Sequence, residues 1–233
     1  MSNSYFWINN EKEIILIFSP KCACSSLHLG FIRNISKIQD KKDPRKLASE
    51  YKLVGNNIYT GIPENFTIFW GTRNPFDRIV SCYFNKYILY KGKRLNKNNL
   101  EGFSKVFLRQ IGIDYENLTF NKFLLGIQNL ILEKKYINPH FNTQVNLENY
   151  NKIKNYPNLV VFDINNIPEI FGKYKANVTK KPINPVFKDL CNVNVKDIKL
   201  EELVKKNFMN SIDLVKKIYK VDYEIFKKYD IIY

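Results

Sequence analysis

The chain has 233 residues, 45% hydrophobic and 15% aromatic, which excludes a disordered protein and predicts one folded domain over residues 1–233. Its 37 Lys and Arg against 22 Asp and Glu give a formal net charge of +15, which we interpret as solvated Lys on helix faces rather than a nucleic-acid surface. No apolar stretch approaches the roughly 20 residues of a membrane span, and no signal peptide is visible.

The first elements predicted along the chain are a buried strand and a helix. The continuous apolar run Ile14–Phe18 is typical of a strand covered on both faces, as in the middle of a parallel sheet. Leu27, Phe31, Ile35 and Ile38 then recur at spacings of four and three, which predicts a helix with one buried stripe.

A second strand and helix follow in the same order. The apolar run Phe66–Trp70 precedes Asn74-Pro75, where Asn can cap a helix and Pro suits its first position. The predicted helix has one apolar stripe, formed by Ile79, Val80, Tyr83, Phe84, Tyr87 and Ile88. Polar loops thus follow both strands at their carboxyl ends, where open α/β sheets bind ligands.

The rest of the chain adds helices and a third strand. Thr119 can cap a helix, and the apolar run Leu159–Phe162 predicts a strand. The apolar spacing from Leu200 to Tyr219 predicts a long helix. Strands that alternate with helices make the predicted class α/β, in a single domain.

The loop after the first strand, Ser19–Ser26, has the composition of an anion site. A phosphate at a helix N-terminus is bound by backbone N–H groups and, here, by Ser hydroxyls, and Lys21 adds a mobile cation. The pattern is not a Walker P-loop, because Lys comes first and no Gly precedes Gly30. This disfavours a GTPase or an ordinary kinase.

The loop after the second strand carries a second candidate anion site. Arg73 leaves the strand before the helix starts, and Ser81 lies two turns into that helix. An Arg guanidinium and a Ser hydroxyl on adjoining elements can hold a second phosphate. Two anion sites at neighbouring strand ends suit a 3′,5′-bisphosphorylated nucleoside.

These motifs resemble those of a known family. SPKCACSSL is similar to the sulfotransferase loop for the 5′-phosphosulfate, and TRNPFDRIVSCY is similar to the 3′-phosphate motif of that family. Weaker resemblance continues through LTFNKFLL, NPHFNTQ, VVFDINNI and KVDYEIFKKY, which look most like the carbohydrate sulfotransferases and their soluble bacterial relatives.

The resemblance implies an α/β fold with a Rossmann-like, P-loop-related parallel sheet flanked by helices. It also implies a sulfotransferase that uses 3′-phosphoadenosine 5′-phosphosulfate (PAPS) as co-substrate and releases adenosine 3′,5′-bisphosphate (PAP). The acceptor is expected to be a hydroxyl, of a glycan by the same resemblance. Arg73 and Ser81 would hold the 3′-phosphate. The 5′-phosphosulfate would lie against a run of six consecutive residues: Lys21, Cys22, Ala23, Cys24, Ser25 and Ser26. Cys22, Ala23 and Cys24 depart from the family, whose members often have Thr, Gly and another small residue there.

Sulfuryl transfer needs charge neutralisation at the leaving phosphate and a base near the acceptor hydroxyl. Lys21 is the candidate for the charge. For the base, His140 follows Asn138-Pro139 in a polar segment, whereas His28 falls inside the first helix. Many sulfotransferases carry the base between the two nucleotide motifs, where this chain offers Glu64 instead, so His140 and Glu64 both remain candidates.

The cysteines predict neither a metal site nor a disulfide framework. Cys22, Cys24 and His28 give only three nearby ligands, so a metal cluster is rejected. Four cysteines in all are expected to be reduced thiols in a cytoplasmic protein. Two alternatives stay open: an atypical nucleotide-dependent kinase, and a nonenzymatic basic module that binds anions.

Overall fold

The computed structural model describes residues 5–22, 27, 31, 62–90, 93–167 and 208–233. The chain forms two compact units. The first comprises Met1–Arg73, Gln144–Cys191 and Glu224–Tyr233, and the second comprises Asn74–Thr143 and Asn192–Tyr223. The expectation of a single domain over residues 1–233 stays a prediction.

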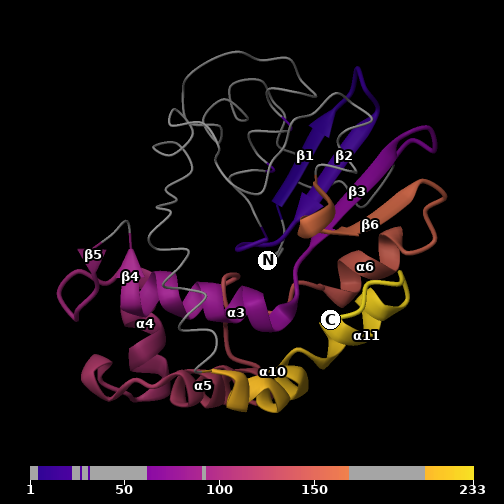
Figure 1. The fold of residues 1–233 in the computed structure, drawn as a ribbon. Helices are drawn as coiled ribbons and strands as arrows, with labels where there is room; N and C mark the ends of the chain where they lie inside the picture. The colour runs from indigo at the N-terminus through magenta and orange to yellow at the C-terminus, as the bar shows by residue number, and fades with distance from the viewer. Residues whose placement is uncertain (1–4, 23–26, 28–30, 32–61, 91–92, 168–207) are drawn as a thin grey trace. The chain divides into compact units, whose positions relative to one another are not determined.

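The first unit contains a four-stranded sheet with the order β1-β2-β3-β6 (Figure 1). Its strands are β1 (Tyr5–Asn9), β2 (Ile14–Phe18), β3 (Thr67–Thr72) and β6 (Leu159–Asp163). The last three run parallel to one another and are the three strands predicted from the apolar runs. The α/β class is confirmed, with one addition: β1 pairs antiparallel with β2 at the edge of the sheet.

The three parallel strands end at the same edge of the sheet. Phe18 of β2 pairs with Gly71 of β3, and Thr72 pairs with Asp163 of β6. The segment after β2 and the segment after β3 therefore leave from neighbouring strands at the carboxyl edge, which is the edge where α/β sheets bind ligands.

Large aromatic side chains cover the sheet. Trp70 of β3 contacts Tyr150 of α6 (Leu147–Ile153) and Phe226 of α11 (Lys220–Lys227), at ring-centroid distances of 5.9 and 6.0 Å. Trp7 of β1 packs edge-on against Phe31 at 5.7 Å. Leu27 and Phe31 are buried, and the remainder of the helix predicted from them lies outside the described residues.

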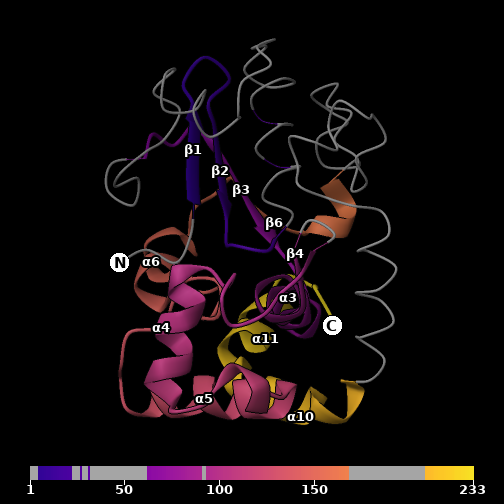
Figure 2. The ribbon, with the colours of Figure 1, turned by 90° about the vertical axis from the view of Figure 1, so that its left-hand side faces the viewer.

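The second unit is helical (Figure 2). Its core is rich in aromatic side chains. Its described helices are α3 (Pro75–Tyr83), which continues as a π-helix (Phe84–Ile88), α4 (Gly102–Ile111), α5 (Phe120–Leu132) and α10 (Ile212–Ile218). A short hairpin, β4 (Leu89–Tyr90) and β5 (Lys93–Arg94), follows the π-helix. The rings of Tyr83, Tyr87, Phe107, Phe123 and Phe141 contact one another in the core.

Both predicted helix starts are confirmed. The side chain of Asn74 accepts a hydrogen bond from the Phe76 amide at 2.8 Å, and that of Thr119 accepts one from the Lys122 amide at 3.2 Å. Each cap satisfies an amide that has no partner within the helix.

The long helix predicted from Leu200 to Tyr219 is confirmed over Ile212–Ile218, which forms α10, but it is not continuous in the part of the chain that the structure describes. A 3₁₀ segment, Met209–Ser211, precedes α10. Asn210 and Ser211 favour helix ends over helix interiors, because their short side chains compete for the backbone.

Candidate active site

The segment after β2 makes a tight turn around Lys21. The Cys22 amide donates to the Ser19 carbonyl at 3.2 Å, and Pro20 and Lys21 occupy the two central positions. Lys21 has a φ of 69°, in the left-handed region. A four-residue turn with Pro at its second position and a positive φ at its third ordinarily has Gly or Asn at the third position. Any other residue there raises the conformational free energy by about 1–2 kcal/mol. The backbone thus holds a lysine where local conformation favours glycine.

Arg73, at the end of β3, contacts this turn. Its Nη1 donates to the Lys21 carbonyl at 2.9 Å. The two motifs come from separate parts of the sequence, 52 residues apart. The structure therefore brings Lys21 and Arg73 together at the carboxyl edge of the sheet.

The rest of the first loop is described only in part. Cys22 is buried, and its thiol donates to the Gln144 Oε1 at 2.9 Å. The predicted nucleotide contacts at Ala23, Cys24, Ser25 and Ser26 lie outside the described residues, as does His28.

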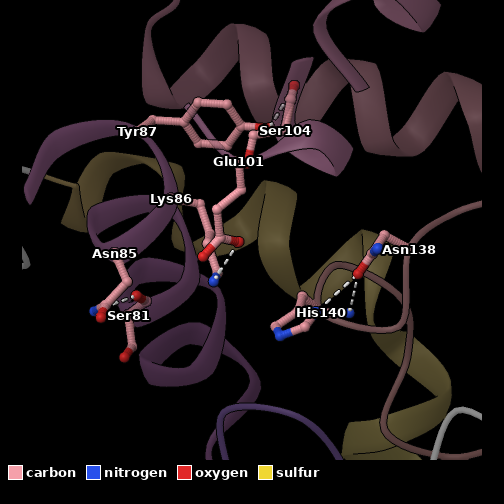
Figure 3. A network of polar contacts seen from close by, with 8 residues as sticks. All are labelled: Ser81, Asn85, Lys86, Tyr87, Glu101, Ser104, Asn138 and His140. Atoms are coloured by element: carbon pink, nitrogen blue, oxygen red, sulfur yellow. Dashed lines mark hydrogen bonds and ion pairs between the residues drawn. The ribbon is translucent and has the colours of Figure 1, made fainter. Parts of the chain in front are cut away.

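Ser81 lies in the second unit, two turns into α3 as the sequence predicted. The residue is buried, and the Asn85 side chain donates to its carbonyl at 3.0 Å (Figure 3). This helix starts at the Asn74-Pro75 cap, so the cap sets where along the helix Ser81 falls. The role of its hydroxyl as a phosphate ligand stays a prediction.

His140 lies in the second unit and is held by Asn138 (Figure 3). The Asn138 Oδ1 lies 3.0 Å from the His140 amide nitrogen and 2.8 Å from its Nδ1. A backbone N–H can only donate, so the atom that it reaches is the carbonyl oxygen of Asn138. That oxygen can only accept, so in the neutral ring Nδ1 carries the proton and Nε2 carries the lone pair.

The backbone around His140 is fixed by two buried side chains. The Arg78 guanidinium donates to the carbonyls of Pro139 and Asn142, at 2.9 and 2.7 Å. The Tyr219 hydroxyl donates to the carbonyl of Phe141. Burial raises the pKa of Tyr219, and the nearby Arg78 charge offsets part of that rise. Carbonyl groups on both sides of His140 are thus bound by buried donors.

Charged and aromatic side chains that the sequence did not reveal gather beside His140. The Phe103 ring stacks on the imidazole at a centroid distance of 5.2 Å and an interplanar angle of 13°. Lys86 Nζ lies 5.0 Å from the centre of the same Phe103 ring and 2.9 Å from Glu101 Oε2. No spacing rule links these residues, because they come from the π-helix, the start of α4 and the segment after α5.

Glu64 lies away from the other candidates of its unit. It is exposed and precedes β3, and its carbonyl accepts a hydrogen bond from the Asn158 side chain at 3.0 Å. Arg73 follows the same strand, whose six residues span about 20 Å. The structure does not bring Glu64 to the edge at which Lys21 and Arg73 meet.

Neither a metal cluster nor a membrane-spanning helix occurs in the described part of the chain. Within the ranges that the structure describes, no three His, Cys, Asp or Glu side chains are grouped so as to hold a metal ion. Among those same residues, no helix combines the length and the apolar character needed to cross a membrane.

Three parallel strands with Lys21 and Arg73 at their carboxyl edge define an α/β protein suited to an anionic ligand. The chain belongs to the sulfotransferase family, whose family model matches residues 4–230. It is therefore a transferase that moves sulfuryl groups, and the family resemblance seen in its two loops is confirmed. No curated protein and no solved structure gives a significant match to the chain.

Proposed function

We propose that the protein transfers the sulfuryl group of PAPS to a hydroxyl of a carbohydrate acceptor. The observation that carries this proposal is the contact between Lys21 and Arg73, since it joins the two predicted nucleotide motifs at one edge of the sheet. Polar loops at neighbouring carboxyl ends of parallel strands are the usual binding place for nucleotides in such sheets.

The side chains fit a nucleotide with two separate anionic groups. Lys21 is a mobile cation in the turn after β2, suited to the bridging oxygen of the 5′-phosphosulfate. Arg73 presents a planar guanidinium, which binds phosphate more specifically than an ammonium does. With Ser81, it is assigned the 3′-phosphate that distinguishes PAPS from other adenine nucleotides.

In the proposed reaction the acceptor oxygen forms a bond to sulfur while the bond between sulfur and the bridging phosphate oxygen breaks. Negative charge grows on that phosphate oxygen, and the Lys21 ammonium neutralises it. The proton of the acceptor hydroxyl passes to the base, and PAP leaves with the electrons of the broken bond. The rate gain comes from alignment and charge stabilisation.

We propose His140 as the base, with Glu64 as the alternative. Asn138 holds the imidazole in the tautomer that leaves Nε2 with a lone pair, and a general base needs that lone pair. In Figure 3 the ring nitrogen not bonded to Asn138 points away from that side chain. Glu64 is exposed at the amino end of β3, which supports it less well.

The carbohydrate acceptor is supported by the resemblance of four further segments, LTFNKFLL, NPHFNTQ, VVFDINNI and KVDYEIFKKY. The protein would be incubated with PAPS and, in turn, with a glycan, a phenol, a sterol and a peptide that contains serine, and the products examined by mass spectrometry. A gain of one sulfuryl group on the glycan alone supports the assignment, and sulfation of another class replaces it.

The nucleotide assignment is tested by thermal shift. PAP should stabilise the protein far more than AMP does, because only PAP has the 3′-phosphate assigned to Arg73 and Ser81. Arg73→Ala should remove most of that difference, since a charge-assisted bond from arginine to phosphate contributes roughly 1.5–3 kcal/mol. Arg109→Ala, at an exposed position on α4, is the matched control for the loss of one positive charge.

The same assay separates the competing functions. Equal shifts with PAP and AMP would remove the assignment of Arg73 and Ser81. A larger shift with ATP and magnesium favours a kinase. Stabilisation by any polyanion, lost as salt is added, favours a nonenzymatic anion-binding module.

A further inference from the structure

Gln144 is a buried amide that binds the backbone at the end of β3. Only 1% of the Gln144 surface is exposed to solvent. The Arg73 amide donates to the Gln144 Oε1 at 2.9 Å, and the Gln144 Nε2 donates to the Arg73 carbonyl at 2.7 Å. These two bonds to one residue are those that a neighbouring strand would make.

The same residue also binds both ends of the Lys21 turn. The Cys22 thiol donates to the Gln144 Oε1, and the Ser19 hydroxyl donates to the Gln144 carbonyl at 3.0 Å. Ser19 and Cys22 lie 125 and 122 residues before Gln144 in the chain. One residue therefore joins the turn after β2 to the first residue after β3.

The hydrogen bonds of Gln144 lie beyond the point where β2 and β3 stop pairing with each other. The pairing of β2 with β3 ends at Phe18 and Gly71, so strand-to-strand bonds stop short of Lys21 and Arg73. Lys21 is also in a left-handed conformation, which persists only where surrounding contacts determine it. Beyond the last ladder pair, Gln144 supplies hydrogen bonds that connect the two segments.

A glutamine amide suits this position chemically. It donates and accepts at once, so it can bind the N–H and the C=O of Arg73 together. It is also neutral, so it places no negative charge beside groups proposed to bind an anion. A glutamate could keep the bonds to the two donors but could not donate to the Arg73 carbonyl.

We infer that Gln144 is a positioning residue that sets the spacing between the Lys21 turn and Arg73. The inference rests on the proposed function, because this spacing is then the spacing between the 5′-phosphosulfate and the 3′-phosphate of PAPS. Gln144 acts through these two residues and does not contact the nucleotide itself.

Three variants test the inference. Gln144→Met keeps the length and loses every side-chain hydrogen bond. Gln144→Glu keeps the acceptor oxygens, loses the donation to Arg73 and adds a negative charge. Thr72→Val is the matched control. Thr72 is buried at the same strand end. Its hydroxyl donates to the Phe162 carbonyl of β6 at 3.0 Å and lies 3.1 Å from the Tyr233 hydroxyl. Thr72→Val reports what the loss of these hydrogen bonds does by itself.

Amide hydrogen exchange is the first readout and needs no nucleotide. In Gln144→Met the amides of Arg73 and Cys22 should both exchange faster, at least about ten-fold, because the link between the segments is lost. Gln144→Glu should protect the Arg73 amide better than Gln144→Met does. Thr72→Val should leave the Cys22 amide unchanged.

Nucleotide preference and turnover are the second readout. Gln144→Met should lose most of the PAP-over-AMP difference and lower kcat by about 100-fold, since a misplacement of about 1 Å costs that much. Thr72→Val should keep the preference even where its thermal midpoint is equally lowered. Unchanged exchange at Cys22, or a PAP preference in Gln144→Met equal to that of the wild type, overturns the inference.

The two proposals fail in different ways. If the wild type shows no preference for PAP over AMP, the proposed function fails whatever the variants do. The exchange of the Arg73 and Cys22 amides then decides alone whether Gln144 joins the segments. If Gln144→Met does not fold, Gln144→Glu replaces it, with loss of PAP preference expected and wild-type preference contrary to the inference.

Discussion

In the first unit a neutral amide, Gln144, binds the backbone of Arg73 and both ends of the Lys21 turn. In the second unit a guanidinium, Arg78, donates to the carbonyls of Pro139 and Asn142. Both side chains are buried. An amide can satisfy N–H and C=O groups together, whereas a guanidinium has donors only and carries a charge whose burial is costly unless several acceptors surround it.

The difference between the Gln144 amide and the Arg78 guanidinium indicates which functional groups each can position. A neutral amide suits a place where an anionic nucleotide is proposed to bind, because it leaves the local charge to Lys21 and Arg73. A buried guanidinium fixes carbonyls around His140, so the imidazole is presented on a rigid segment. If so, variants of His140 should alter transfer and spare nucleotide binding, whereas variants of Lys21 should act on the donor nucleotide.

The largest effect is expected at His140. His140→Ala should lower turnover by about 100- to 10,000-fold, the range for loss of a general base, with PAP binding intact. In the wild type the rate should fall at acidic pH, because a protonated imidazole cannot take the proton of the acceptor hydroxyl. Steady-state rates across pH, with PAP binding measured in parallel, check both expectations.

Glu64→Gln is the paired variant for this experiment. It should keep wild-type activity, because Glu64 lies at the amino end of β3. Loss of activity in Glu64→Gln with activity retained in His140→Ala would move the base to the segment between the nucleotide motifs. Two active variants would mean that neither residue is the base.

The next effect in size is expected at Lys21. Lys21→Ala should lower the transfer rate by about 100-fold while PAP affinity falls less, because the ammonium acts mainly on charge that develops in the transition state. Single-turnover rates and PAP titrations separate the two quantities. Lys12→Ala, at an exposed lysine of the same unit, should match the wild type. Normal turnover in Lys21→Ala would contradict the role of the ammonium.

The smallest effect concerns Tyr219 and alkaline pH. Burial raises the pKa of its hydroxyl, so the folded chain keeps a proton that the unfolded chain loses above about pH 10. Folding stability should therefore fall as the pH rises through this range, by up to about 1.4 kcal/mol per pH unit for this group. Tyr219→Phe should lose about 1 kcal/mol at pH 8, from the bond to Phe141, and then show a shallower alkaline fall.

Urea unfolding at pH 8, 10 and 11 measures this difference. Tyr136→Phe, at an exposed tyrosine of the same unit, is the matched control and should follow the wild-type curve. An alkaline fall in Tyr219→Phe as steep as that of the wild type would show that the buried hydroxyl does not contribute to it.

The sequence was sufficient for those features that depend on neighbouring residues. The runs Ile14–Phe18 and Phe66–Trp70 predicted buried parallel strands, and Asn74 and Thr119 predicted helix starts, because hydrophobic periodicity and capping are local. The order of the two motifs along the chain and the ends of their strands also placed Lys21 and Arg73 at one edge of the sheet.

The features that the sequence did not predict depend on distant residues. Gln144 binds partners more than 70 positions away, and Arg78 binds carbonyls more than 60 positions away. A polar residue destined for such a contact has no periodicity that distinguishes it from an exposed one. The antiparallel edge strand β1 was also missed.

The left-handed backbone at Lys21 has a consequence for protein engineering. Glycine there would relieve about 1–2 kcal/mol of conformational strain, and it would remove the ammonium proposed to act on the leaving group. A screen that selects only for thermal tolerance would therefore favour glycine at this position and lose the variants that keep the proposed catalytic lysine. Stability and turnover are opposed at one backbone site, so directed evolution of this enzyme would need to select for both.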